Sequence, residues 1–123
     1  MAKILIVDDE KDIVELLSFL LEKDGHQVVP AYNGKEALAA VEMSHPDLIV
    51  LDIMMPEIDG YTVHAMLSEN PATRSIPIII LTAKGQLRDL FEVASNVYAL
   101  IEKPFDQKSF REKVQEALVK KSV

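Results

Sequence analysis

The segment LIVLD at residues 48–52 has four consecutive apolar residues followed by one carboxylate. A strand that is covered on one face alternates apolar and polar side chains, whereas a strand covered on both faces is apolar throughout. The unbroken run from Leu48 to Leu51 therefore predicts the centre of a parallel sheet with helices on both sides. It leaves Asp52 at the carboxyl end of the strand, where such sheets bind their ligands.

Similar apolar runs lie on both sides of this segment, and amphipathic segments separate them. We expect strands at Ile4 to Val7, Gln27 to Ala31, Leu48 to Leu51, Ile78 to Leu81 and Tyr98 to Ile101. Five strand-helix units predict a flavodoxin-like, doubly wound α/β fold with a five-stranded parallel sheet and five helices. Pro30 is tolerated mainly on an edge strand, which favours the strand order 2-1-3-4-5.

The expected helices are recognised by apolar residues at helical spacing and by residues that begin or end a helix. Their apolar stripes lie within Ile13 to Leu21, Ala37 to Val41, Val63 to Leu67, Leu87 to Ala94 and Phe110 to Leu118. Asn33 and Asp106 are of the type that caps a helix start, and Gly25 is of the type that ends one.

Length and composition limit the class of protein. The 123 residues, 49% of them hydrophobic, suit one domain over 1–123, and the absence of cysteine excludes thiol chemistry. The 20 acidic against 13 basic residues give a formal charge of -7, which opposes direct binding of nucleic acid or anionic lipid. The apolar runs are far shorter than the roughly 20 residues of a membrane span, and the start lacks a signal-peptide core. We therefore expect a cytoplasmic protein that does not bind membranes.

Polar residues directly follow four of the predicted strands. They are Asp8, Asp9 and Glu10 after the first strand, Asp52 after the third, Thr82 after the fourth and Lys103 after the fifth. In the order 2-1-3-4-5 the first and third strands are neighbours, so their carboxylates converge, with the hydroxyl and the ammonium to one side. We expect Asp8, Asp9, Asp52, Thr82 and Lys103 to share one cleft.

Clustered carboxylates need cations. Two like charges about 4 Å apart repel by about 4 kcal/mol at an effective dielectric constant near 20, which Lys103 alone does not offset. Mg²⁺ suits such a site, because it takes one or two carboxylates and completes its octahedron with water and phosphate oxygens. This predicts phosphoryl chemistry with Asp52 as the nucleophile, because a carboxylate is already ionised at neutral pH.

Other phosphate-binding sites are disfavoured by the first strand-helix turn. It has neither the glycines of a dinucleotide-binding loop nor the GxxxxGK[ST] pattern. Its acidic residues would also repel the phosphate of a flavin mononucleotide.

The motifs ILIVDDE, LIVLDIMMPEIDG, IIILTA and EKPF, in this order and spacing, resemble the response-regulator receiver domain of two-component signal transduction. Asp52 follows Asp8 by 44 positions, Thr82 follows 30 positions later, and Lys103 follows 21 positions after that. Each motif is common by itself, but the combination is specific and the resemblance covers essentially the whole chain.

The resemblance implies roles for the acidic residues. Asp52 would accept a phosphoryl group from a phosphohistidine on a sensor histidine kinase or phosphotransfer protein. Asp9 would bind Mg²⁺ directly and Asp8 through water, while Asp52 and the carbonyl of Met54 would complete the protein ligands.

The resemblance also implies a phosphate site on the other side of Asp52. Thr82 and the amide of Ala83 would bind phosphate oxygens, and Lys103, in a cis bond to Pro104, would pair with the phosphate. Met54 and Lys84 would tune the rate of dephosphorylation.

Two departures from the family pattern concern the switch that follows Thr82. The family usually has Tyr or Phe three residues before the lysine, and here this position is Leu100. Tyr98 lies two residues earlier, and strand alternation predicts that it is on the same side as Leu100. Asn96-Val97-Tyr98 also replaces the usual Gly-Ala-Asp.

These features predict a signalling switch and not an enzyme acting on other substrates. Phosphorylation of Asp52 would change the affinity for an unknown downstream protein. We expect a monomer or weak dimer, either stand-alone or excised from a longer protein, and favour the stand-alone form. Two alternatives remain, a phosphate-independent interaction module of the same fold and an aspartyl-phosphate phosphohydrolase. The hydrolase fits less well because Met54 stands where such enzymes carry a second acid.

Overall fold

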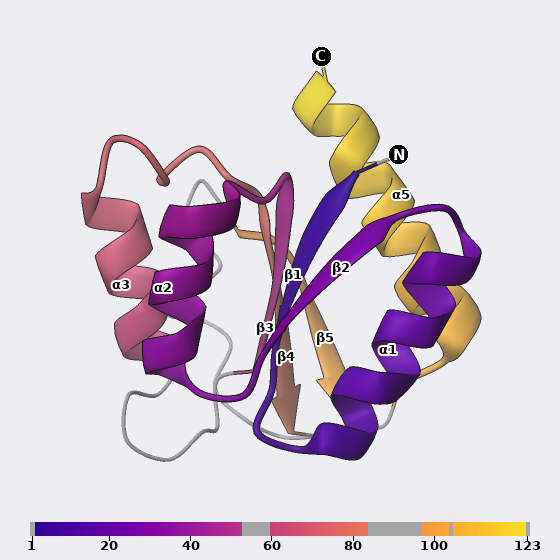
Figure 1. Cartoon of the computed structure of the whole chain (residues 1–123). Coiled ribbons are helices and arrows are strands. Elements are labelled where there is room, and N and C mark those ends of the chain that lie inside the picture. Colours follow the sequence, from indigo (N-terminus) through magenta and orange to yellow (C-terminus); the bar gives the residue numbers. More distant parts are fainter. Residues whose placement is uncertain (1, 53–59, 84–96, 104, 123) are drawn as a thin grey trace.

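A computed structural model describes residues 2–52, 60–83, 97–103 and 105–122. Its elements are β1 (Lys3–Val7), α1 (Lys11–Lys23), β2 (Gln27–Ala31), α2 (Gly34–Ser44), β3 (Leu48–Asp52), α3 (Gly60–Glu69), β4 (Ile78–Ala83), β5 (Val97–Lys103) and α5 (Gln107–Ser122). The strands form one parallel sheet in the order β2-β1-β3-β4-β5, which confirms the predicted topology (Figure 1). The described residues contain four helices, and the helix predicted over Leu87 to Ala94 lies outside them.

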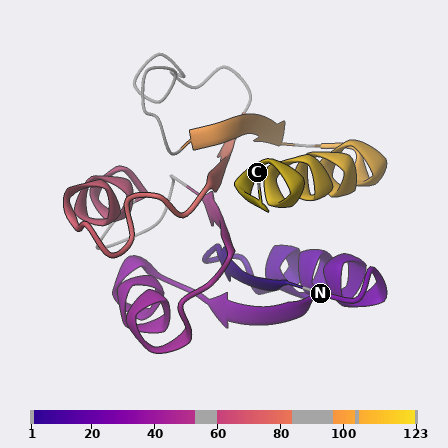
Figure 2. The same cartoon turned by 90° about the horizontal axis from the view of Figure 1, so that it is seen from above.

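Helices cover both faces of the sheet, as Figure 2 shows in the view from above. On one face, residues such as Ile6 pack with buried side chains of α1 and α5. On the other face, the next residue, Val7, packs with buried side chains of α2 and α3. Successive side chains of a strand point to opposite faces, so each inner strand contributes to both clusters.

The sequence signals for the edge and the centre of the sheet are both confirmed. β2 lies at the edge, where Pro30 stands opposite Ile6 of β1 and is exposed to solvent. All five residues of β3 are buried, as expected for a strand with a helical layer on each face.

The predicted helix boundaries also have the expected local contacts. The side-chain oxygen Oδ1 of Asn33 accepts a hydrogen bond from the amide of Glu36 at 2.8 Å, at the start of α2. Asp106 accepts one from the amide of Ser109 at 2.9 Å, at the start of α5. Gly25, just after α1, has a φ of +91°, a conformation that residues with a Cβ rarely adopt.

Phe110 anchors α5 to the sheet. Its side chain is fully buried among residues of α1 and the central strands. We predict that Phe110→Ala lowers the free energy of unfolding by about 3–5 kcal/mol, because it removes apolar contacts and leaves a cavity. Chemical denaturation measures this change. Phe19→Ala is the control, since Phe19 is 62% exposed and should change stability by less than about 0.5 kcal/mol. Equal effects of the two substitutions would contradict the assigned packing.

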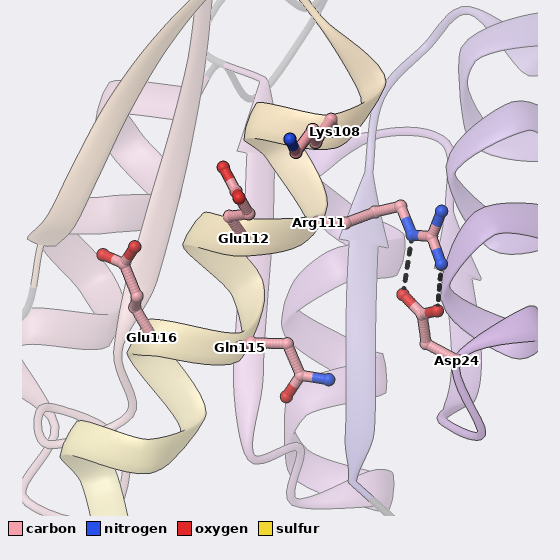
Figure 3. Close-up of a pocket in the computed structure, with 6 residues that line it drawn as sticks. All are labelled: Asp24, Lys108, Arg111, Glu112, Gln115 and Glu116. Atoms are coloured by element: carbon pink, nitrogen blue, oxygen red, sulfur yellow. Dashed lines mark hydrogen bonds and ion pairs between the residues drawn. The ribbon is translucent and has the colours of Figure 1, made fainter.

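An ion pair joins the end of α1 to α5 (Figure 3). The Nε and Nη2 atoms of Arg111 donate hydrogen bonds to the carboxylate of Asp24. The Nε atom lies 2.9 Å from Oδ2. The pair forms one wall of a surface groove whose other lining residues all come from α5. These contacts hold the pKa of Asp24 below its usual range, because the hydrogen bonds and positive charge of Arg111 outweigh the opposing effect of burial.

The lowered pKa of Asp24 makes the stability of the fold depend on pH. A carboxylate whose pKa is depressed in the folded state stabilises that state above its unfolded pKa of about 3.9. This contribution is lost as the pH falls through the folded-state pKa. We predict that Asp24→Asn is less stable than wild type at pH 7 and that the difference shrinks as the pH falls below 4. Denaturant titrations over this range measure it, with Glu22→Gln on the same exposed helix end as control. A difference that persists unchanged at low pH would contradict the assignment.

Candidate functional site

The candidate site lies where the carboxyl ends of four strands meet, at the lower edge of the sheet in Figure 1. Asp8 directly follows β1, while Asp52, Thr82 and Lys103 belong to the ends of β3, β4 and β5. The parallel register places Asp52 beside Leu81, one residue before Thr82. The structure therefore brings together the groups that the sequence predicted to share one cleft.

Three carboxylates form the acidic part of the site. Asp8, Asp9 and Asp52 each offer a carboxylate oxygen, and these oxygens all lie within 4.8 Å of one another. Asp8 and Asp52 are buried, with 0% and 3% of their surface exposed, whereas Asp9 is exposed. Burial makes each charge costly unless a cation or hydrogen-bond donors compensate it.

Lys103 supplies one such cation. Its Nζ atom lies 2.9 Å from Oδ2 of Asp8 and 3.7 Å from Oδ2 of Asp52. Burial opposes the charge of the ammonium, but the hydrogen bond to Asp8 and the charges of Asp52 and Asp8 outweigh it, so the pKa of Lys103 lies above its usual value. The lysine therefore stays protonated at neutral pH.

Asp8 already has protein partners on both carboxylate oxygens. Oδ1 accepts a hydrogen bond from the amide of Glu10 at 2.9 Å, and Oδ2 accepts the one from Lys103. Direct binding of a metal ion by Asp8 would have to share or replace one of these bonds. This arrangement supports a contact through water, whereas Asp9 is exposed and free of such a pair of hydrogen bonds among the described residues.

The donor set fits Mg²⁺. Three hard carboxylate oxygens in a small region open to solvent at Asp9 match its preference for carboxylates combined with water and phosphate oxygens. The lysine does not complete this compensation, since one positive charge faces three negative ones. Asp8, Asp9 and Asp52 are the residues that would hold the ion.

The side of the site that was predicted to bind phosphate is described in part. Thr82 is buried, and the backbone of Ala83 continues β4 beside Lys103 of β5. Both lie at the strand end predicted from the sequence. Met54, Lys84 and Pro104, which the sequence analysis also singled out, lie outside the described residues.

Glu10 is a contact residue that the sequence analysis did not assign to the site. Its Oε1 atom lies 3.3 Å from Nζ of Lys103. The signal was present, because Glu10 directly follows the two aspartates, but only the position of β5 shows that its side chain reaches the lysine.

Comparison with known proteins identifies the family of the chain. The family described as "Response regulator receiver domain" matches residues 4–115. The chain belongs to this family. As a receiver domain it is a signalling switch of two-component systems, and receiver domains generally bind Mg²⁺ at an acidic pocket.

Several relatives and solved structures resemble this receiver domain along most of its length. PhoP of Bacillus subtilis, an alkaline phosphatase synthesis transcriptional regulatory protein, is 40% identical over 119 residues, which are 94% of this chain and 48% of PhoP. Protein PilG of Pseudomonas aeruginosa is 39% identical and is covered to 78%, with 85% of this chain aligned. A receiver domain protein of Clostridium thermocellum superimposes with a TM-score of 0.88 at 27% identity, covering 99% of this chain and 98% of its own. Chemotaxis protein CheY4 of Vibrio cholerae has a TM-score of 0.86 at 28% identity, with coverages of 96% and 99%.

The chain spans about half the length of the first curated relatives that it matches, 48% and 49% in two cases. None of the helices in the described ranges has the length and apolar character needed to cross a membrane.

The prediction that Tyr98 lies on the same side of β5 as Leu100 is wrong. Leu100 packs in the cluster of α2 and α3, whereas Tyr98 packs in the cluster of α1 and α5. The reason is a register shift, because Ile78 pairs with Val97 and the next residue, Ile79, pairs with Ala99. Tyr98 is thus the additional residue of a β-bulge, and an added residue breaks the alternation of side chains.

The hydroxyl of Tyr98 is engaged on the α5 face. It donates a hydrogen bond of 3.0 Å to Oε1 of Glu116. This bond and partial burial raise the pKa of Tyr98. The only aromatic side chain near the usual switch position in β5 is therefore directed away from the face that holds Leu100.

We predict that Mg²⁺ stabilises the wild-type receiver domain against denaturant. An ion that binds only the folded state at 100 times its dissociation constant adds about 2.7 kcal/mol. Asp9→Asn should lose most of this increment, because it removes the exposed carboxylate of the cluster. Urea titrations with and without MgCl₂ measure it, with Glu15→Gln on the exposed side of α1 as the control. An undiminished increment in Asp9→Asn would contradict the assigned ligand.

Proposed function

We propose that this receiver domain accepts a phosphoryl group on Asp52 from the phosphohistidine of a sensor kinase or phosphotransfer protein, and that phosphorylation alters its affinity for a downstream protein. The observation that carries the proposal is the position of Asp52, buried at the end of the central strand within 3.7 Å of the Lys103 ammonium. The Lys103 ammonium, together with the Mg²⁺ that Asp8, Asp9 and Asp52 would hold, would offset the negative charge of the phosphoryl group that Asp52 attacks.

The chemistry assigned to the protein is a single in-line displacement. A carboxylate oxygen of Asp52 forms a bond to phosphorus, the bond between phosphorus and the histidine nitrogen breaks, and that nitrogen keeps the electron pair. Bound Mg²⁺ would supply positive charge to the phosphoryl oxygens from the side of Asp8 and Asp9. A carboxylate nucleophile needs no general base, because carboxyl groups are ordinarily ionised at neutral pH.

Lys103 and the end of β4 would stabilise the phosphoryl group once it is attached. The ammonium already lies beside Asp52 and needs to move little to contact a phosphate oxygen. Thr82 and the amide of Ala83 would donate hydrogen bonds from the adjacent strand end. Hydrolysis of the resulting acyl phosphate returns the domain to its starting state, so the cycle is one of signalling and not of substrate turnover.

The downstream partner belongs to the same proposal. Relatives that match along about half of their length include a protein named as a DNA-binding master transcriptional regulator in Synechocystis. By analogy, the partner whose binding changes on phosphorylation of Asp52 would have a regulatory role. It would be either a whole protein or a segment of one. The strongly acidic receiver domain itself, with a net charge of -7, is not proposed to contact nucleic acid.

A phosphate-independent interaction module is the second candidate, and the bulge at Tyr98 favours it. With Leu100 at the switch position and Tyr98 turned toward α5, a phosphoryl group could occupy the site without rearranging β5. Amide chemical shifts in the presence of Mg²⁺ and beryllofluoride, a phosphoryl mimic, separate the candidates. Changes that extend along β5 and α5 support the switch, whereas changes confined to the carboxyl ends of β1, β3 and β4 support the module.

We predict that wild type gains one phosphoryl group when incubated with acetyl phosphate and Mg²⁺, and that Asp52→Asn gains none. Intact-mass spectrometry measures the adduct, and a chelator should prevent its formation on wild type. Asp12→Asn, which removes an exposed carboxylate of the first turn of α1, is the control and should accept the group normally. An adduct on Asp52→Asn, or none on wild type, would overturn the proposed site.

A further inference from the structure

The ammonium of Lys103 lies closer to Asp8 and Glu10 than to the nucleophile Asp52. Its Nζ atom is 2.9 Å from Asp8 and 3.3 Å from Glu10, but 3.7 Å from Asp52, which exceeds an ordinary hydrogen bond. The two nearer carboxylates lie together at the end of β1 and the start of α1. The ammonium is therefore drawn toward the β1 side of the cleft.

Glu10 contributes to this position of the ammonium with a side chain that does not cap its own helix. It is the residue at the N-terminal cap of α1, yet its side chain makes no capping hydrogen bond. Its backbone serves the local structure instead, because the amide donates to Asp8 and the carbonyl accepts from Ile13 and Val14. The carboxylate, 62% exposed, contacts Lys103 across 93 residues of sequence.

We propose that Glu10 is a positioning residue that retains the Lys103 ammonium on the β1 side of the cleft and so competes with a phosphoryl group on Asp52 for it. The inference rests on the proposed function. Two opposite effects follow from the geometry. The negative charge of Glu10 strengthens the binding of Mg²⁺ nearby, while its contact with Lys103 weakens the binding of the phosphoryl group.

Two substitutions separate the effect of the negative charge of Glu10 from the effect of its contact with Lys103. Glu10→Gln removes the charge and the ion pair, whereas Glu10→Asp keeps the charge but shortens the side chain by one methylene, so that it no longer reaches Lys103. Both variants should fold, because the side chain is mostly exposed. Asp12→Asn is the matched control, since it removes a charge from the same helix start and is not one of the carboxylates paired with Lys103.

The affinities for Mg²⁺ alone and for beryllofluoride at saturating Mg²⁺ are measured by titration calorimetry. For Glu10→Gln we expect Mg²⁺ affinity to fall and beryllofluoride affinity to rise, each by about two- to fivefold, the range for partly exposed ion pairs. Glu10→Asp should raise the beryllofluoride affinity while leaving that for Mg²⁺ unchanged. Asp12→Asn should leave the beryllofluoride affinity unchanged. If both Glu10 variants leave beryllofluoride affinity unchanged, or lower it together with Mg²⁺ affinity as a structural defect would, the inference is overturned.

A measurement without metal tests the contact itself. Hydrogen exchange of the Lys103 ammonium, followed by ¹⁵N-detected NMR, should be faster in Glu10→Gln than in wild type and unchanged in Asp12→Asn. Equal exchange in wild type and Glu10→Gln would overturn the inference whatever the outcome with Mg²⁺. Failure of wild type to bind beryllofluoride, with the exchange difference present, would instead overturn the proposed function and leave the contact of Glu10 with Lys103 established.

Discussion

The ion pair between Asp8 and Lys103 joins the end of β1 to the end of β5 across the site, over 95 residues of sequence. Asp8 has no exposed surface, so its charge would be costly without a cation within hydrogen-bond distance. The pair can form only when β1, β3, β4 and β5 are aligned in parallel with their carboxyl ends level. The alignment of the strands therefore also decides which charged groups meet in the cleft, and the other contacts of the site depend on the same alignment.

The same lysine connects three carboxylates of different roles. Asp8 neutralises it, Glu10 draws it to one side, and Asp52 lies just beyond hydrogen-bond distance. A cation shared among several anions can move between them at low cost, because each shift exchanges one favourable contact for another. This property suits a site that must stabilise a phosphoryl group at one time and only carboxylates at another.

The elements of the fold were predictable because each has a local cause. Residues 48–51 are all apolar because both faces of β3 are covered, and Pro30 marks the edge because it cannot donate a hydrogen bond to a neighbouring strand. The convergence of Asp8, Asp9 and Asp52 was predictable as well, since adjacent parallel strands end at the same edge. The contact of Asp24 with Arg111 was not, because it depends on how far α5 is displaced along α1.

By itself, the sequence determined the class of fold, the order of the strands and the convergence of Asp8, Asp9, Asp52 and Lys103 at one edge of the sheet. These depend on the periodicity of apolar residues and on which residues end each strand, both of which are local properties. Only the tertiary structure decided that Tyr98 faces α5 and that Glu10 reaches Lys103. The face of a residue after a bulge depends on its pairing with the neighbouring strand, and the reach of a side chain depends on the position of a distant one. Neither the pairing of β4 with β5 nor the distance from α1 to β5 is encoded in a local pattern.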